Sequence, residues 1–143
     1  MELQFDLKLT GLDKLKPDMI KKLRRILWLC MNKIDEIATW LASVDKGRLR
    51  NSIHIYPMRE GENSYIVTDG VEHGIFVEFE TSPHIIRPRI KKALSWIDDT
   101  NKRVFAKKVH HPGTNAQPFF RPALKEVRDA WVQYYTNKVF NKP

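Results

Sequence analysis

In the stretch HHPGTNAQPFFRPALKEV, residues 110–127, a segment rich in turn-forming residues changes into a helical pattern. Pro112-Gly113 can form a turn with the glycine at a position that needs a positive φ. Pro122 suits the first turn of a helix, since its missing N–H would be unpaired there. The stretch therefore predicts a rigid strand-to-helix joint. Its residues are Pro112, Gly113, Gln117, Pro118, Phe119, Phe120, Arg121 and Pro122.

Two further features support the joint. Gln117 and Arg121 each precede a proline, which biases both residues away from the α region. Phe119 and Phe120 follow Pro118 directly, and we expect at least one of the two rings to be buried. Fully burying such a ring stabilises a fold by ~1.5–3 kcal/mol.

A catalytic loop is the alternative interpretation of the same stretch. His110 and His111 are adjacent, so on a strand they point to opposite faces. This arrangement suits neither a metal site nor a general base with an orienting partner. The sequence also lacks HExxH, Cys/His ligand spacing, a phosphate-binding glycine loop and GxSxG. We expect no enzymatic activity, no cofactor and no catalytic or metal-binding residues.

One nuclease-like constellation stays open as an alternative. Glu78 and Glu80 share strand spacing and could bind a metal together with Asp98 or Asp99. Solvated acidic side chains are the simpler interpretation of these residues.

The composition is that of a globular protein. The chain has 143 residues, of which 42% are hydrophobic and 29% charged, so we expect one domain over residues 1–143. No apolar run approaches the ~18 residues of a membrane span. The first residues do not have the pattern of a signal peptide. Cys30 is the sole cysteine, which excludes an intrachain disulfide.

The hydropathy pattern predicts an α+β fold. We expect a mixed or antiparallel sheet of about four to six strands, packed against one long N-terminal helix and one C-terminal helix. Strands are expected at 2–10, around 53–56 and at 64–68, with a turn at 59–63. Helices are expected at about 18–44, with Gly47 as its stop, and at about 122–140 with an aromatic face on the sheet. A second hairpin is expected from strands 84–97 and 103–110, and residues 71–83 fit a short helix or a strand.

The long helix carries an apolar stripe with three- and four-residue spacing. Cys30 lies on this stripe and is expected in the core. Trp28 and Trp40 lie off its centre and could either edge the core or meet a partner. The stripe consists of Ile20, Leu23, Leu27, Cys30, Ile34, Ile37 and Leu41.

The net charge of +8 and the pI near 9.7 favour an anionic partner, either nucleic acid, an acidic protein or a membrane surface. Cations at the start of the long helix oppose its dipole, at ~0.3–1 kcal/mol each when exposed at low salt. Solvated lysines in a small basic protein are the alternative. The candidate assembly interface comprises Lys21, Lys22, Arg24, Arg25, Arg48, Arg50, Arg87, Arg89, Lys91, Lys107 and Lys108.

Three segments, GRLRNSI (47–53), FVEFET (76–81) and HPGTNAQPFFRPAL (111–124), stand in this order along the chain. Together they resemble a family of tailed-bacteriophage neck and tail-completion proteins. Glu80 departs from the family pattern, where a glycine is usual, and this affects the local turn. The matching residues are Gly47, Leu49, Arg50, Ser52 and Ile53, then Val77, Glu78, Phe79 and Thr81, then His111, Pro112, Gly113, Thr114, Gln117, Pro118, Phe119, Arg121, Pro122 and Ala123.

The resemblance implies a non-enzymatic virion protein of the neck, assembled in the host cytoplasm. Such a protein completes the tail end or joins it to the head, as a ring of identical subunits, with a hexamer expected. Its partners would be itself, connector proteins and tail-tube or tail-terminator proteins, with no membrane. Non-specific contact with DNA in the channel stays open. The alternative function is a small basic nucleic-acid-binding protein, with or without metal-dependent nuclease activity.

Overall fold

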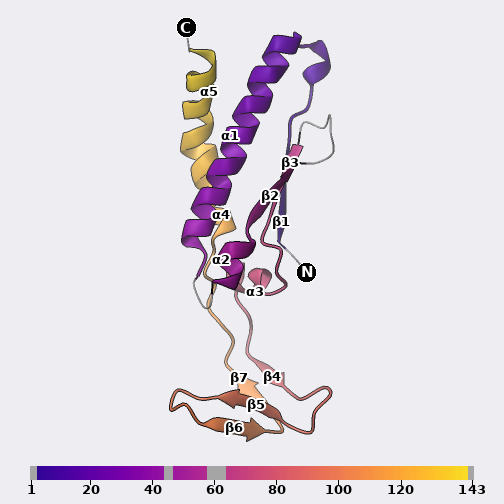
Figure 1. Ribbon diagram of the computed structural model, residues 1–143, viewed down its shortest axis with the longest axis vertical. Helices are drawn as coiled ribbons and strands as arrows, with labels where there is room; N and C mark the ends of the chain where they lie inside the picture. Colours follow the sequence, from indigo (N-terminus) through magenta and orange to yellow (C-terminus); the bar gives the residue numbers. More distant parts are fainter. Residues whose placement is uncertain (1–2, 44–46, 58–63, 142–143) are drawn as a thin grey trace.

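The computed structural model describes residues 3–43, 47–57 and 64–141, and they form a body and an arm (Figure 1). We define the arm as residues 82–113 and the body as the other described residues. The strands are β1 Gln4–Lys8, β2 His54–Pro57, β3 Ser64–Thr68, β4 His84–Ile86, β5 Leu94–Ile97, β6 Arg103–Ala106 and β7 Val109–His111. The α-helices are α1 Pro17–Leu41, α2 Arg48–Ser52, α3 Gly74–Glu78, α4 Phe120–Glu126 and α5 Val132–Phe140, with a 3-10 turn at Leu12–Lys14 and a π-helical turn at Val127–Trp131.

The body contains a three-stranded antiparallel sheet with the order β1-β3-β2. Phe5 and Ile55 both pair with Val67, which places the three side chains on one face of the sheet. Val67 is fully buried and the other two are partly buried against the core that α1 completes. The predicted strands at 53–56 and 64–68 are confirmed, and the first strand is shorter than predicted. The predicted turn at 59–63 lies outside the described residues.

Helix α1 contributes more buried residues to the core than any other element, because one of its faces is apolar. Its 25 residues give a length of roughly 37 Å. Cys30 is buried, as predicted, and Trp40 is 77% exposed. Gly47 does not end this helix, since α1 ends at Leu41. Gly47 instead precedes α2 in a left-handed conformation with φ of 72°.

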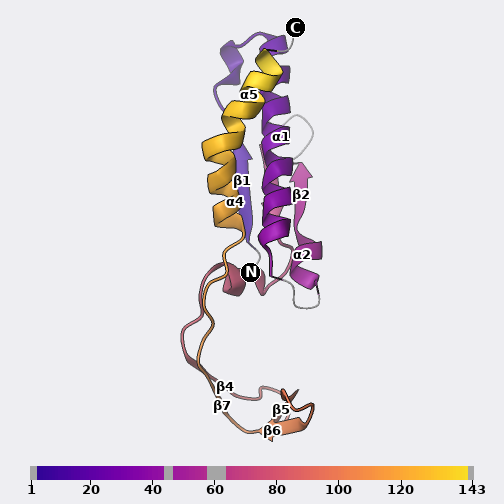
Figure 2. The ribbon, with the colours of Figure 1, turned by 90° about the vertical axis from the view of Figure 1, so that its left-hand side faces the viewer.

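The C-terminal helix packs beside α1, which differs from the predicted position on the sheet (Figure 2). The ammonium groups of Lys22 and Lys33 on α1 lie 5.3 Å and 4.2 Å from the ring centroids of Phe140 and Trp131. The helix approaches the sheet at its start, where the rings of Phe5 and Phe120 are 5.0 Å apart. The C-terminal helix therefore packs mainly on α1 and reaches the sheet only at its first turn.

The π-helical turn changes which side chains of the C-terminal helix are buried. The predicted stripe of Leu124, Val127, Trp131, Tyr134 and Lys138 assumed unbroken α-helical spacing. A π turn uses i→i+5 hydrogen bonds and therefore shifts the following residues around the helix. The structure accordingly buries Tyr135, whereas Tyr134 is 51% exposed.

The arm holds the remaining four strands as two separate pairs, β4 with β7 and β5 with β6. The predicted hairpin turn around residues 98–101 is confirmed, but its two long strands are interrupted. Pro88 follows β4, and residues 87–93 form a loop, because proline lacks the N–H that a paired strand requires. Residues 71–83, left open by the sequence, contain the short helix α3. The α+β class, the long N-terminal helix and the C-terminal helix are confirmed.

Candidate assembly surface

The joint between the arm and α4 is organised by a buried carboxylate. Glu78 is fully buried at the end of α3. Its Oε2 accepts hydrogen bonds from the backbone N–H groups of Phe119 and Phe120, at 2.7 and 2.9 Å, and its Oε1 accepts from that of Arg121 at 3.0 Å. The first N–H groups of a helix have no partner within it, and a negative charge there is favourable. Glu78 therefore caps the start of α4 from 41 to 43 residues away in the sequence.

Arg121 fastens the same contact from the opposite side. Its Nε donates to Glu78 Oε1 at 3.0 Å, and its Nη2 donates to the backbone carbonyl of Glu78 at 2.7 Å. Its guanidinium also lies over the ring of Phe79, 4.7 Å from the centroid. Arg121 is helical although it precedes Pro122, which differs from the prediction. These bonds hold it in the helix against the steric preference.

The predicted features of the joint are present in the structure. Phe119 and Phe120 are both fully buried, which confirms the prediction for at least one ring. Gly113 has φ of 89°, and a side-chain Cβ at this position would overlap the backbone oxygen of Thr81. Thr81 and Thr114 pair beside it through two backbone hydrogen bonds of 3.0 and 3.1 Å. The arm thus leaves the body through two closely paired chain segments.

The nuclease-like constellation is not assembled. Glu78 is neither a metal ligand nor a solvated acid, because its carboxylate oxygens are occupied by the joint. Asp98 belongs to the turn of the arm, where hydrogen bonds from the Lys102 N–H and from Thr100 hold its pKa below the ordinary carboxyl value. Among the described residues no group of three or more His, Cys, Asp or Glu side chains is placed to hold a metal ion.

Nine of the eleven predicted basic residues fall into two groups at opposite ends of the molecule, and Arg48 and Arg50 lie on α2 between them (Figure 1). The cluster at the start of α1 lies at the end of the body that is far from the arm. The second group stands on the arm and is exposed: Arg87, Arg89, Lys91, Lys107 and Lys108. The arm as a whole carries eight Lys and Arg against Asp98 and Asp99, so it holds +6 of the net charge of +8.

Two of the predicted interface residues make contacts inside the chain. Arg50 Nη2 lies 3.4 Å from the backbone oxygens of both Trp40 and Ala42, where it can donate to the carbonyl groups at the end of α1. Lys22 lies over the ring of Phe140. We therefore assign these two side chains to the fold, while Arg48, on the same short helix as Arg50, is exposed. Lys46 lies outside the described residues.

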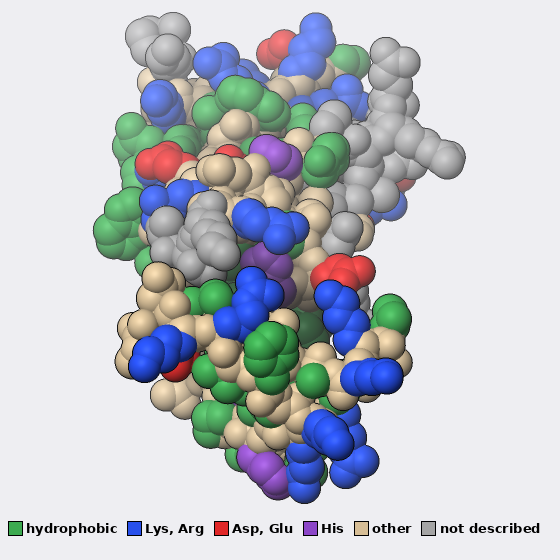
Figure 3. Space-filling model, turned by 60° about the horizontal axis from the view of Figure 1, so that its bottom comes forward, with side chains coloured by type: hydrophobic (Ala, Val, Ile, Leu, Met, Phe, Trp, Pro, Cys, Tyr) green, Lys and Arg blue, Asp and Glu red, His purple; other side chains and the backbone are tan. Residues whose placement is uncertain are grey.

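Large apolar side chains accompany the charges of the arm. Figure 3 shows Lys and Arg side chains standing among hydrophobic ones on this end of the molecule, with few acidic groups. Ile90 is 98% exposed and Phe105 is 65% exposed, and Ile85, Trp96 and Ile97 are also exposed. No side chain of the arm is among the buried residues of the described chain. The sequence did not predict that these apolar side chains are exposed. The alternation of polar and apolar residues in β5 and β6 resembles that of a strand in a packed sheet.

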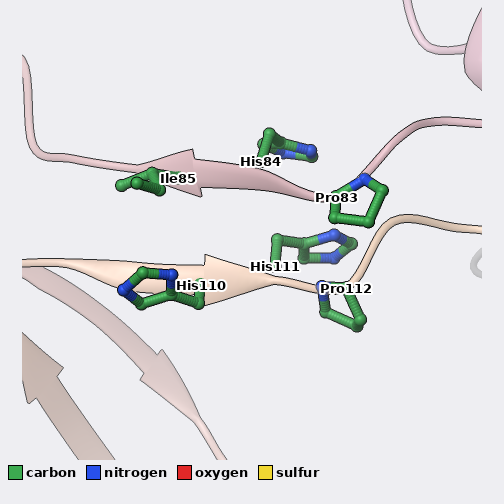
Figure 4. Close-up of a pocket in the computed structure, with 6 residues that line it drawn as sticks. All are labelled: Pro83, His84, Ile85, His110, His111 and Pro112. Atoms are coloured by element: carbon green, nitrogen blue, oxygen red, sulfur yellow. The ribbon is translucent and has the colours of Figure 1, made fainter.

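The two histidines of the opening stretch behave as their spacing predicts. Figure 4 shows the rings of His84 and His111 next to each other across β4 and β7, with Pro83 and Pro112 beside them. The ring centroids of this stacked pair are 5.0 Å apart, and His110 is paired with Ile85 instead. These residues line a shallow, open hollow of about 340 Å³, which contains no acidic side chain.

An apolar groove of about 580 Å³ lies on the body between β1, α1 and the C-terminal helix. Leu7 and Leu9 contribute from the end of the first strand, Leu23 from α1, and Leu124 and Val132 from the C-terminal helix. The groove borders β1, which is an edge strand of the sheet. An edge strand and an open apolar groove together form a surface on which another chain can pack.

None of the described helices combines the length and the apolar composition that a membrane span requires. Comparison of the chain with protein-family models, with curated proteins and with solved structures finds no match.

Proposed function

We propose that this chain is a structural subunit of a phage neck, which assembles as a ring of identical copies that completes the tail or joins it to the head. The proposal combines the three ordered segments that resemble neck and tail-completion proteins with a surface suited to assembly. The proposed role is non-enzymatic, since Glu78 and Asp98, two of the acidic residues that could have formed a nuclease site, are engaged in hydrogen bonds of the joint and of the arm turn.

The exposed surface carries the assembly part of the proposal. The chain exposes 10,912 Å². A compact monomer of 16.9 kDa exposes about 7,700 Å² by the usual scaling of area with mass. The excess of roughly 3,200 Å² is comparable to the area that a subunit would bury in two obligate interfaces, at about 1,000–2,500 Å² per partner in each interface. A ring gives every subunit two such interfaces.

The joint supports the proposal because it holds the arm rigidly on the body. A ring subunit must hold its projecting parts at a fixed angle to fit its neighbours. Glu78 and Arg121 fix the return of the chain from the arm into α4 with five hydrogen bonds. A surface loop that serves only as a connection does not need so many hydrogen bonds at its base. The network is consistent with an arm whose position relative to the body must be fixed.

Electron microscopy of lysates tests this function. A phage with a stop codon in this gene should give filled heads and separate tails, and supplying the protein should restore joined particles. Overlong tails would instead assign the chain to tail termination within the same family of roles. Normal infectious particles that lack the protein would contradict the proposed function.

A nucleic-acid-binding role is the second candidate, and the charge of the arm favours it. A net charge of +6 within 32 residues, next to exposed Trp96 and Phe105, would allow contacts to phosphates and stacking on bases. Such binding would weaken steeply with salt. A DNA-binding titration at two salt concentrations, with metal-dependent cleavage measured in parallel, distinguishes this role from the structural one.

A further inference from the structure

We propose that the arm of one subunit packs into the apolar groove of the next copy of the same chain, and that this contact forms the ring. The inference rests on the proposed homo-oligomeric ring and adds the two surfaces that would make it. The contact is heterologous, since two different surfaces of identical chains meet, and repeating it generates a ring or a helical filament.

The arm requires a partner for its own stability. It has no buried side chain, and two-stranded hairpins are marginally stable in water unless they pack against another layer. The pairing of Ser95 with Phe105 places both on one face of the hairpin, and Ile97 shares that face. A large aromatic side chain carries ~150–250 Å², so Phe105 alone exposes roughly 130 Å² at its 65% exposure.

The groove offers the complementary surface. It is lined mainly by Leu, Ile and Val side chains, and Val132 on its wall is 42% exposed. Its volume of about 580 Å³ lies within the ~300–1,000 Å³ of ligand pockets, which is sufficient for several large side chains. The apolar side chains of the arm and the apolar groove both stay exposed to solvent in a single chain. A second copy can cover both surfaces, because its groove can accept the arm of the first.

Charge indicates that the arm meets the body of a neighbour and not another arm. Two arms would bring charges of +6 together, whereas the remainder of the chain has a net charge of +2. At the groove, Arg128 is paired with Asp129 at 2.7 Å, and Asp6 and Lys8 have opposite charges. The rim is therefore close to neutral and accepts a basic arm with little repulsion.

The first test measures the mass of the full chain in solution by analytical ultracentrifugation. Phe105→Asp on the arm and Val132→Asp in the groove should each raise the dissociation constant at least ~30-fold, as expected for a truncated hot spot. Lys92→Ala is the arm control, because this exposed residue lies outside the candidate assembly interface and its replacement changes the net charge by the same amount as Phe105→Asp. Gln133→Asp is the groove control, because it places the same acid on the neighbouring exposed position. Circular dichroism checks that all four variants fold.

The second test mixes the two interface variants. Each should be a 16.9 kDa monomer alone, but a 1:1 mixture should give a heterodimer of twice that mass, because one intact arm still meets one intact groove. Variants that stay assembled, or a mixture that stays monomeric, would overturn the inference. A wild-type chain that is monomeric and binds DNA through the arm would overturn it in favour of nucleic acid.

The outcome is separable from that of the proposed function. Subunits that assemble through arm and groove but are dispensable for infectious particles would refute the neck role alone. Particles that need the protein, while both interface variants still assemble like the wild-type chain, would refute the arm-and-groove contact alone.

Discussion

Replacing Glu78 by glutamine should destabilise the protein strongly, although the two side chains have nearly the same shape. Glutamine retains one acceptor oxygen and replaces the other by an NH₂ group. If the amide oxygen takes the position that faces Arg121, the NH₂ group meets the N–H groups of Phe119 and Phe120, so donors oppose donors. The other orientation instead places the NH₂ group against the Arg121 donors.

The magnitude follows from the number of bonds lost and from the burial of the site. A hydrogen bond to a charged group contributes about 1.5–3 kcal/mol, and two such bonds are lost. Removing one partner of a buried ion pair costs about 3–5 kcal/mol. Both arguments give a loss of about 3–5 kcal/mol, which is a large fraction of the ~5–15 kcal/mol that stabilises a typical domain. Arg121→Ala should cost less, about 1–2 kcal/mol, because Arg121 is the half-exposed partner, at 52%, and Glu78 keeps its three backbone N–H donors.

Urea unfolding followed by circular dichroism measures this difference. With a slope near ~2 kcal/mol per molar urea, the midpoint of Glu78→Gln should fall by roughly 2 M. Glu80→Gln is the matched control, because this neighbouring acid is exposed, and it should change the free energy of unfolding by less than ~0.5 kcal/mol. A loss below ~1 kcal/mol for Glu78→Gln, or a loss equal to that of the control, would refute the capping role of this carboxylate.

Three further changes test other parts of the structure. Gly113→Ala should lower the free energy of unfolding more than Gly11→Ala and should weaken hydrogen-exchange protection of the arm. Both glycines have a positive φ, but only at Gly113 would a Cβ meet the backbone of Thr81, so equal losses of ~1–2 kcal/mol for the two variants would contradict this. Asp35→Asn should stabilise the protein at pH 7, because burial raises the pKa of Asp35 and the charged form therefore lowers stability as pH rises through the ordinary carboxyl range. Urea unfolding should show that the variant is more stable than the wild type at pH 7 and equally stable below that range, and a stability difference that does not change with pH would contradict this reasoning. Cys30 should react with a thiol reagent slowly until the chain unfolds, because burial raises the pKa of its thiol, and immediate labelling of the native chain would argue against its buried position.

Periodicity predicted the elements of the body well, because each is determined mainly by its own sequence. The stripe of α1 and the alternation of β1 each place one apolar face on the core, and a one-residue shift would expose it. The π turn at Val127–Trp131 was not predicted, since its spacing conflicts with the regular pattern on either side. Tyr135 therefore takes the buried position that the pattern assigned to Tyr134.

The candidate site was predicted less completely, because its main contacts are distant in the sequence. The prolines and aromatic residues identified the joint at 112–122, but no local pattern links Glu78 to Arg121. The residue spacing instead placed Glu78 and Glu80 on one face of a strand. The signal that could have indicated the cap is a helix start at Phe120 with no Ser, Thr, Asp or Asn at the N-cap, which requires an acceptor from elsewhere.

The division into body and arm could not be predicted from local sequence patterns either. Residues 84–111 have strand-like alternation, which predicts pairing but not the sheet to which the strands belong. Pro88 interrupts the first predicted strand, and only the three-dimensional arrangement shows that the hairpin stands away from the core. The exposed side chains of Ile90 and Phe105 can then be interpreted as part of a surface that contacts a partner.

Electron cryomicroscopy of the purified full chain would show directly whether it forms a ring through its arm and groove. We expect closed rings in which each arm lies on the neighbouring body, with the apolar groove filled. Single subunits at micromolar concentration, or rings whose arms point free into solvent, would contradict it.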